Sequence, residues 1–159
     1  MAFYKQLSEY YDSIFPVDAT EMRFVSGVLA GRKRILDIGC GTGNKTVLLA
    51  REDAEIIAID NDAGMIETAA TANAGPNIRY ILADMAEPGL ALSGAGLSGM
   101  TFDGAVCLGN TLVHLTTPRA IGTLLRDTAR FPAPGGVFVA PILHYHRPLD
   151  RHIPELPRL

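Results

Sequence analysis

The chain has 159 residues, 48% of them hydrophobic and 19% charged, a size and balance that fit one globular domain with a sizeable core. A formal net charge of −3 without basic runs argues against a nucleic-acid partner, because binding to a phosphate backbone depends on clustered Lys and Arg. No apolar run approaches the roughly 20 residues that span a bilayer, and no signal peptide is evident. We therefore expect a cytoplasmic protein whose partner is a small molecule, with no role for membrane or nucleic acid.

Helical patterns alternate with short apolar runs along the chain. Asp18 or Thr20 can cap a first helix, Asn44 opens a second, Asp62 opens a third and Thr117 precedes a fourth. The apolar runs are rich in branched residues and bounded by turn formers, which predicts buried strands. These strands are expected at Arg34–Ile38, Glu55–Ile59, Ile78–Leu82, Phe102–Leu108 and Val137–Leu143.

This alternation predicts a fold. Strands joined by helices run parallel, since each right-handed crossover returns the chain to the same edge of the sheet. The expected class is α/β, with a Rossmann-like doubly wound parallel sheet in three layers, and ligands bind at the carboxyl ends of such strands. The glycine-rich stretch Pro88–Met100 is expected to be a connection or a weak helical turn.

The first predicted strand breaks into three glycines at alternate positions, in Ile-Leu-Asp-Ile-Gly-Cys-Gly-Thr-Gly at residues 35–43. Without a Cβ, these glycines can take positive φ and let a ligand lie against bare backbone. Asp37 stands where a carboxylate can orient a bound polar group. A dinucleotide fingerprint needs its third glycine three places after the second, where Asn44 stands here. This weakens an oxidoreductase interpretation.

The spacing Asp-x-Gly-x-Gly-x-Gly resembles the first motif of class I S-adenosylmethionine-dependent methyltransferases. The resemblance implies that S-adenosylmethionine is the cofactor and S-adenosylhomocysteine the product. In that family the glycines face the methionine part of the cofactor. The residues that would form this part of the site are Asp37, Gly39, Cys40, Gly41 and Gly43.

Asp60 closes the second predicted strand, where an open α/β nucleotide site places a carboxylate against the ribose hydroxyls. The family's second motif is the same acid. A helix cap is the alternative, because Asp60, Asn61 and Asp62 form a good capping sequence. Asn61 belongs to the expected cofactor site, and Met65 could pack on the adenine, although Met on a helix is more often core.

Asp84 and Met85 follow the third predicted strand. In the family, the acid at this position binds the adenine amino group and the backbone of its neighbour contacts the ring. A carboxylate accepts a hydrogen bond from an exocyclic amino group, which favours adenine over a keto base. The alternative for Asp84 is an ordinary turn aspartate.

Residues 107–114, Cys-Leu-Gly-Asn-Thr-Leu-Val-His, resemble the fourth-strand motif of glycine and sarcosine N-methyltransferases. By this resemblance Leu108 and His114 line the cofactor pocket, and Asn110 binds substrate near the transferred methyl group. His114 could instead be a histidine satisfied at the start of a helix. The implied reaction is in-line methyl transfer to a small nucleophile, an amine in this branch, which requires no catalytic acid or base.

The amino-terminal residues 1–16 resemble the family's lid, a segment that folds over bound cofactor. Tyr11 is the candidate for its aromatic ring. Arg23 could reach the cofactor's carboxylate, although an arginine on an amphipathic helix is usually solvated.

Residues 144–159 show no strand pattern and are expected to be an irregular tail. The family fold has two further strands here, so the chain is expected to be a single truncated domain whose fifth strand could pair with a second copy. A cofactor-binding fragment or regulatory module without catalysis is the alternative function. His144 and His146 stand at alternate positions just after the fifth predicted strand and would share one face if that strand continued, but two ligands alone make a poor metal site, so no metal is expected. His146 stands where the family often has Asp, which leaves the substrate open.

Overall fold

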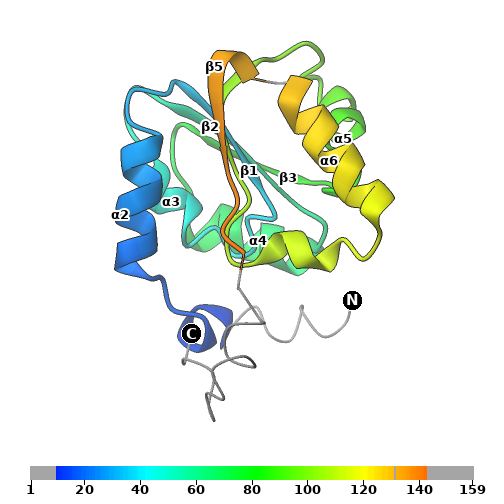
Figure 1. Cartoon of the computed structure of the whole chain (residues 1–159). Coiled ribbons are helices and arrows are strands. Elements are labelled where there is room, and N and C mark those ends of the chain that lie inside the picture. The colour runs from blue at the N-terminus through cyan, green and yellow to red at the C-terminus, as the bar shows by residue number, and fades with distance from the viewer. Residues whose placement is uncertain (1–9, 131, 143–159) are drawn as a thin grey trace, which may run out of the picture.

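The computed structural model describes residues 10–130 and 132–142, and within them five parallel strands form one sheet in the order β3-β2-β1-β4-β5. Figure 1 shows the sheet between two groups of helices. Every strand pairing is parallel, which confirms the predicted doubly wound arrangement. The strands are β1 (Arg34–Ile38), β2 (Glu55–Asp60), β3 (Ile78–Leu82), β4 (Phe102–Val106) and β5 (Pro132–Val139).

The last two strands depart from their predicted bounds. β4 ends at Val106 and not at Leu108, and β5 runs over Pro132–Val139 instead of Val137–Leu143. The register explains both ends, because Val106 pairs with Val139 and the Cys107 N–H donates the next hydrogen bond to the Val139 carbonyl at 2.9 Å. β4 and β5 therefore end at the same level of the sheet. Residues 144–159, with His144 and His146, lie outside the described residues.

Side-chain carboxylates begin two of the helices. Asp18 accepts hydrogen bonds from the backbone of Thr20 and Glu21 at the start of α2 (Ala19–Val28). Asp62 does the same for Gly64 and Met65 at the start of α4 (Ala63–Ala72). Each cap satisfies backbone N–H groups that have no partner within the helix. Both helix starts were predicted from the sequence.

One other helical prediction was wrong, and for a second stretch the structure decides between the two alternatives. Asn44 does not open the next helix, since α3 (Thr46–Leu49) follows Lys45 and the Asn44 side chain bonds to another segment. The glycine-rich stretch contains a helix, α5 (Pro88–Gly94), because Pro88 can occupy its first turn and Leu92 is buried in the core. Residues 10–14 are also helical, η1 is a 3₁₀ turn (Thr111–His114), and α6 spans Pro118–Arg130.

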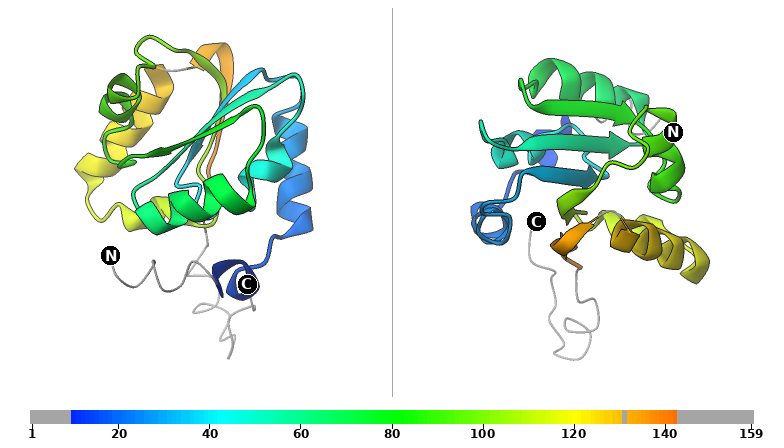
Figure 2. Two further views of the ribbon diagram at one scale, coloured as in Figure 1. Left: turned by 180° about the vertical axis from the view of Figure 1, so that it is seen from behind. Right: turned by 90° about the horizontal axis from the view of Figure 1, so that it is seen from above.

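Apolar side chains cover both faces of the sheet. In β1 and β2, Ile35 and Ile56 pack with α2 and α3, whereas Leu36 and Ile57 pack on the opposite face with residues of α5 and α6. Side chains alternate between faces along a strand, so a strand buried on both sides needs an unbroken apolar run. The two views of Figure 2 show these helices on opposite sides of the sheet. Among residues 10–130 and 132–142, no helix is both long and apolar enough to cross a membrane.

Candidate functional site

The glycine turn after β1 has the positive φ angles that its sequence predicts, at 73° for Gly39, 55° for Gly41 and 76° for Gly43. The three positions differ in what surrounds them. A Cβ on Gly39 would lie 2.3 Å from the Thr111 methyl carbon, and one on Gly43 would lie 2.6 Å from the Tyr80 hydroxyl oxygen. A Cβ on Gly41 would meet nothing nearer than a Tyr11 ring carbon at 3.9 Å. Gly41 is therefore the glycine that presents bare backbone to open space.

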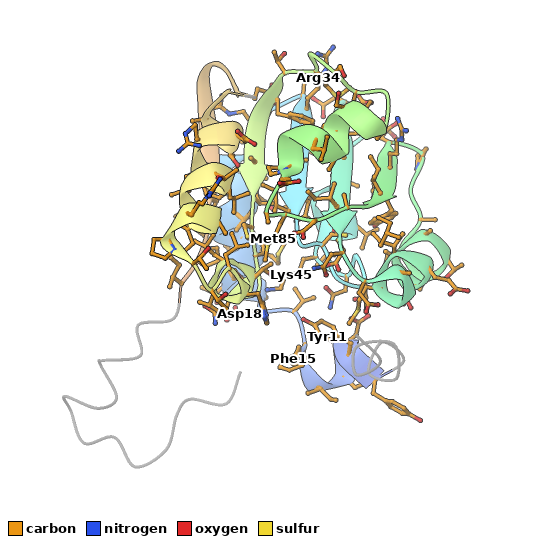
Figure 3. The ribbon with its side chains drawn as sticks, turned by 90° about the vertical axis from the view of Figure 1, so that its right-hand side faces the viewer. Tyr11, Phe15, Asp18, Arg34, Lys45 and Met85 are labelled. Carbon is orange, nitrogen blue, oxygen red and sulfur yellow. The ribbon has the colours of Figure 1, made fainter. Side chains whose placement is uncertain are left out.

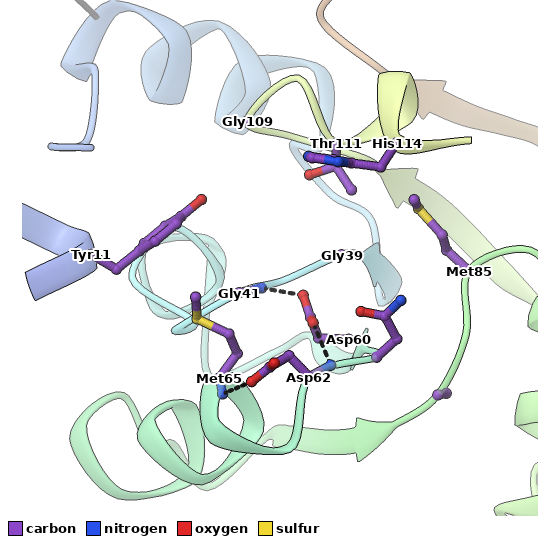
Figure 4. A pocket seen from close by; sticks show the side chains of 12 residues that line it. Tyr11, Gly39, Gly41, Asp60, Asp62, Met65, Met85, Gly109, Thr111 and His114 are labelled. Carbon is purple, nitrogen blue, oxygen red and sulfur yellow. Dashed lines mark hydrogen bonds between the residues drawn. The ribbon is translucent and has the colours of Figure 1, made fainter. Parts of the chain in front are cut away.

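Asp60 joins this turn to the turn after β2. Its Oδ2 accepts a hydrogen bond from the Gly41 N–H at 2.9 Å, and its Oδ1 accepts one from the Asp62 N–H, also at 2.9 Å. The cap of α4 is Asp62, so the alternative that Asp60 serves as the helix cap does not hold. Figure 4 shows these bonds, with Asp60 directed toward the pocket.

A pocket opens at the carboxyl ends of β1, β2, β3 and β4. Tyr11 and Met85 stand at opposite sides of it with Asp60 between them (Figure 4). Eight predicted residues line this pocket together: Tyr11, Gly39, Gly41, Asp60, Asn61, Met65, Met85 and His114. Four more residues line the pocket that were not predicted as site residues, although each directly adjoins a predicted residue or motif: Asp62, Ala83, Gly109 and Thr111.

Asp37 lies beneath the turn and outside the pocket lining. Its side chain is 2% exposed and accepts a 2.7 Å hydrogen bond from the Thr46 hydroxyl. Burial raises the pKa of this carboxyl to about 6, and the nearby charge of Asp60 also raises it, while the Thr46 bond acts in the opposite direction. Cys40 and Cys107 are buried free thiols whose pKa values are raised by burial.

The β3 end of the pocket is contributed by the residues on either side of Asp84. Ala83 and Met85 line the pocket, whereas Asp84 is exposed and accepts a 2.8 Å hydrogen bond from the Ala86 N–H within its own turn. That bond is the one expected of a turn aspartate. A contact between Asp84 and adenine stays a prediction.

The β4 end turns sharply through Gly109 and Asn110, which have φ angles of 67° and 59°. Among the described residues, Asn110 is the one non-glycine with positive φ, a conformation that Asn tolerates better than most residues. The Thr111 hydroxyl donates a 2.6 Å hydrogen bond to the Leu108 carbonyl. Leu108 is buried among residues of the α2 and α3 face, and neither Leu108 nor Asn110 belongs to the pocket lining.

Two further predicted residues lie away from the pocket lining. Arg23 is exposed on α2, and Gly43 packs against Tyr80. Among the described residues, no three His, Cys, Asp or Glu side chains cluster in a way that could hold a metal ion.

Comparisons with known proteins identify the family. Residues 35–136 match the model of the methyltransferase domain family, and this chain belongs to that family. It is 29% identical to mouse glycine N-methyltransferase over 117 residues, which are 69% of this chain and 40% of the mouse protein. It is 34% identical to the ubiquinone biosynthesis O-methyltransferase of Caulobacter sp. over 113 residues, which are 70% of this chain and 41% of that protein.

The fold is similar to that of solved structures. The structure of the sugar N-methyltransferase KedS8 from Streptoalloteichus superposes with a TM-score of 0.70 at 22% identity, covering 84% of this chain and 52% of that one. This likeness shows a shared fold. The chain spans about two fifths of the length of the two curated relatives described above.

Proposed function

We propose that this protein is a methyltransferase that binds S-adenosylmethionine in the pocket and transfers its methyl group to a small-molecule amine. One observation carries the proposal: Asp60 is held at the strand ends by a backbone N–H on each carboxylate oxygen, directly beside the bare backbone of Gly41. Family membership supports the same reaction.

The pocket residues suit the parts of this cofactor. A carboxylate offers about four acceptor positions, and two at Asp60 are used by backbone N–H groups, which leaves acceptors for two ribose hydroxyls. Met65 and Met85 offer polarizable apolar surface for a purine. Gly41 allows the methionine part to approach the main chain, and Tyr11 covers the open side of that turn.

The protein's task in such a reaction is alignment and exclusion of water. When bound, the cofactor would supply a methyl group activated by its sulfonium and a neutral thioether, that of S-adenosylhomocysteine, as the leaving group. Holding two reactants near attack geometry can account for about 7–11 kcal/mol of a barrier. A neutral amine needs no general base to attack, so no catalytic side chain is assigned.

An amine acceptor is supported by the similarity to glycine N-methyltransferase. A hydroxyl acceptor is the second candidate, because the Caulobacter relative is an O-methyltransferase with similar identity and coverage. The two differ in chemistry, since a hydroxyl must lose its proton to become an effective nucleophile.

Calorimetric titration with S-adenosylhomocysteine and with NAD tests the cofactor first. We expect S-adenosylhomocysteine to bind and NAD not to bind. Binding of NAD without binding of S-adenosylhomocysteine would contradict the proposal. Transfer of a radiolabelled methyl group to matched panels of small amines and alcohols then tests the acceptor. Turnover with amines supports the proposal, turnover with alcohols alone favours the second candidate, and binding without any turnover favours a cofactor-binding module.

A further inference from the structure

The amino-terminal helical segment is joined to the glycine turn by one carboxylate. Asp12 Oδ1 accepts hydrogen bonds from the Thr42 hydroxyl at 2.6 Å and from the Asn44 side-chain amide at 2.8 Å. Both donors belong to the chain between β1 and α3, 30 and 32 residues further along the sequence. We call the three residues Asp12, Thr42 and Asn44 the clasp.

The turn side of the clasp is firmly held. Thr42 is fully buried, and its carbonyl accepts a 2.9 Å hydrogen bond from the Asn73 side-chain amide at the end of α4. The Asn73 carbonyl in turn accepts a 2.9 Å bond from the Tyr80 hydroxyl on β3, and Tyr80 packs beneath Gly43. Movement of Thr42 would therefore disturb α4 and β3, so Asp12 is bonded to a fixed point.

Tyr11, next to Asp12, lines the pocket. Its ring packs against Phe15 with the ring centres 4.9 Å apart, and its carbonyl accepts a 2.8 Å hydrogen bond from the Phe15 N–H. Figure 3 shows Tyr11 on the short helix and Phe15 just after its end. The position of Asp12 thus determines where the Tyr11 ring stands relative to Gly41.

Burial holds this segment only in part. Tyr10 is 63% exposed, Ile14 50% and Phe15 38%, so each of the three keeps a sizeable part of its surface in contact with solvent. Since hydrophobic stabilisation follows the area removed from water, the charge-assisted bonds of Asp12 supply an attachment that this incomplete burial does not.

These observations give Asn44 a role as well. In a dinucleotide fingerprint its position is a glycine that allows close packing of helix and strand. Here an amide donor replaces that glycine and bonds to Asp12. Asn44, which breaks the dinucleotide fingerprint, therefore also attaches the amino-terminal helical segment beside the pocket.

We propose, on the basis of the proposed function, that Asp12 is a positioning residue: through the clasp it keeps Tyr11 over the cofactor and slows cofactor release. Asp12 is not assigned a contact with cofactor or substrate. Its effect passes through the segment that carries Tyr11.

Two measurements on the full chain test this proposal. Hydrogen exchange of residues 10–15 in the ligand-free protein reports whether the segment is attached, and surface plasmon resonance reports the release rate of S-adenosylhomocysteine. We expect Asp12→Ala to raise both the exchange rate and the release rate by about tenfold. A change of this size is typical when hydrogen bonds to a charged group are lost. Asp12→Asn keeps an oxygen acceptor and should restore release to within about threefold of the original rate.

Asp53→Ala is the matched control. This carboxylate also accepts hydrogen bonds from two side chains, those of Lys33 and Arg51, but it precedes β2 and so lies at the opposite end of the sheet from the pocket. It should change neither rate. Asn44→Ala should accelerate both by about threefold, and Asp12→Ala combined with Asn44→Ala should be no faster than Asp12→Ala alone, because the two residues share one bond.

The outcomes separate the clasp from the proposed function. Equal exchange rates in Asp12→Ala and the original protein would overturn the clasp. Faster exchange with unchanged release would overturn the positioning role. An original protein that does not bind S-adenosylhomocysteine would defeat the proposed function, while the exchange comparison would still decide whether the clasp exists.

Discussion

The two halves of the pocket are built differently. On the β1 and β2 side, Asp60 bonds to the turns after both strands, and Asp12 and Asn73 bond to Thr42 from distant segments. On the β3 and β4 side, the bonds of Asp84 and Thr111 stay within two or three residues of each side chain. Long-range side-chain bonds tie one half together, whereas the Asp84 and Thr111 side chains of the other half bond within their own turns. The backbone still links the halves, since the Ala83 N–H donates a 2.7 Å hydrogen bond to the Asp60 carbonyl.

This difference predicts that the two halves of the pocket respond differently to substitution. A substitution in the interlocked half changes several elements together and should affect both stability and cofactor binding. A substitution in the locally bonded half should change what the pocket accepts, with a smaller effect on the fold. Four substitutions, at Gly41, Asp37, Asp60 and Asp84, test this difference.

The largest effect is expected from Gly41→Val. A side chain here would fill the space where bare backbone faces the pocket, so binding of S-adenosylhomocysteine should fall below detection in calorimetry. Gly31→Val is the control, because Gly31 has a φ of 76° and open surroundings and lies at the other end of β1. Both variants bear the strain of positive φ, about 1–2 kcal/mol, and should lose similar stability in denaturant unfolding. Binding retained by a folded Gly41→Val protein would contradict the site.

The next effect concerns Asp37 beneath the interlocked half. Its pKa is raised to about 6 by burial, so the unfolded chain gives up this proton at lower pH than the folded protein does. The contribution to stability is therefore present below about pH 4 and is lost as pH rises through 6, in total about 3 kcal/mol.

Asp37→Asn should remove this dependence. The asparagine oxygen can still accept the Thr46 hydroxyl, but the position no longer carries a charge to desolvate. We expect the stability of Asp37→Asn relative to the original protein to rise between pH 4 and pH 7, measured by urea unfolding at each pH. Parallel pH profiles of the two proteins would show that Asp37 does not titrate in this range.

The smallest effects are expected from replacing one carboxylate in each half of the pocket. Asp60→Ala should weaken S-adenosylhomocysteine binding by about 1.5–3 kcal/mol, because it removes acceptors for the ribose hydroxyls. It should also lower stability, since the Gly41 and Asp62 N–H groups lose their partner.

Asp84→Ala should cost less than about 1 kcal/mol of stability, because it removes one exposed bond. Calorimetry with S-adenosylhomocysteine and with its inosine analogue decides its role. Loss of preference for adenine would support the contact predicted for Asp84, and an unchanged preference would make it a turn residue. Equal losses of stability in Asp60→Ala and Asp84→Ala would contradict the proposed difference between the halves.

Local sequence was enough to predict much of this protein. The five strands and the two capped helices follow from apolar runs and capping residues, and the glycine turn follows from three glycines that permit positive φ. Asp60 was predicted because a carboxylate at the end of a parallel strand lies at the ligand edge of the sheet. Each of these inferences depends on residues that are neighbours in the chain.

Tertiary structure decided the rest. Thr111 meets Gly39 because β4 lies beside β1 in the sheet, and Asn44 bonds to Asp12 across 32 residues instead of opening a helix. The ends of β4 and β5 depend on their mutual register. Local patterns specify which conformation a segment prefers, but partners distant in sequence are chosen only when the sheet and its helices pack together.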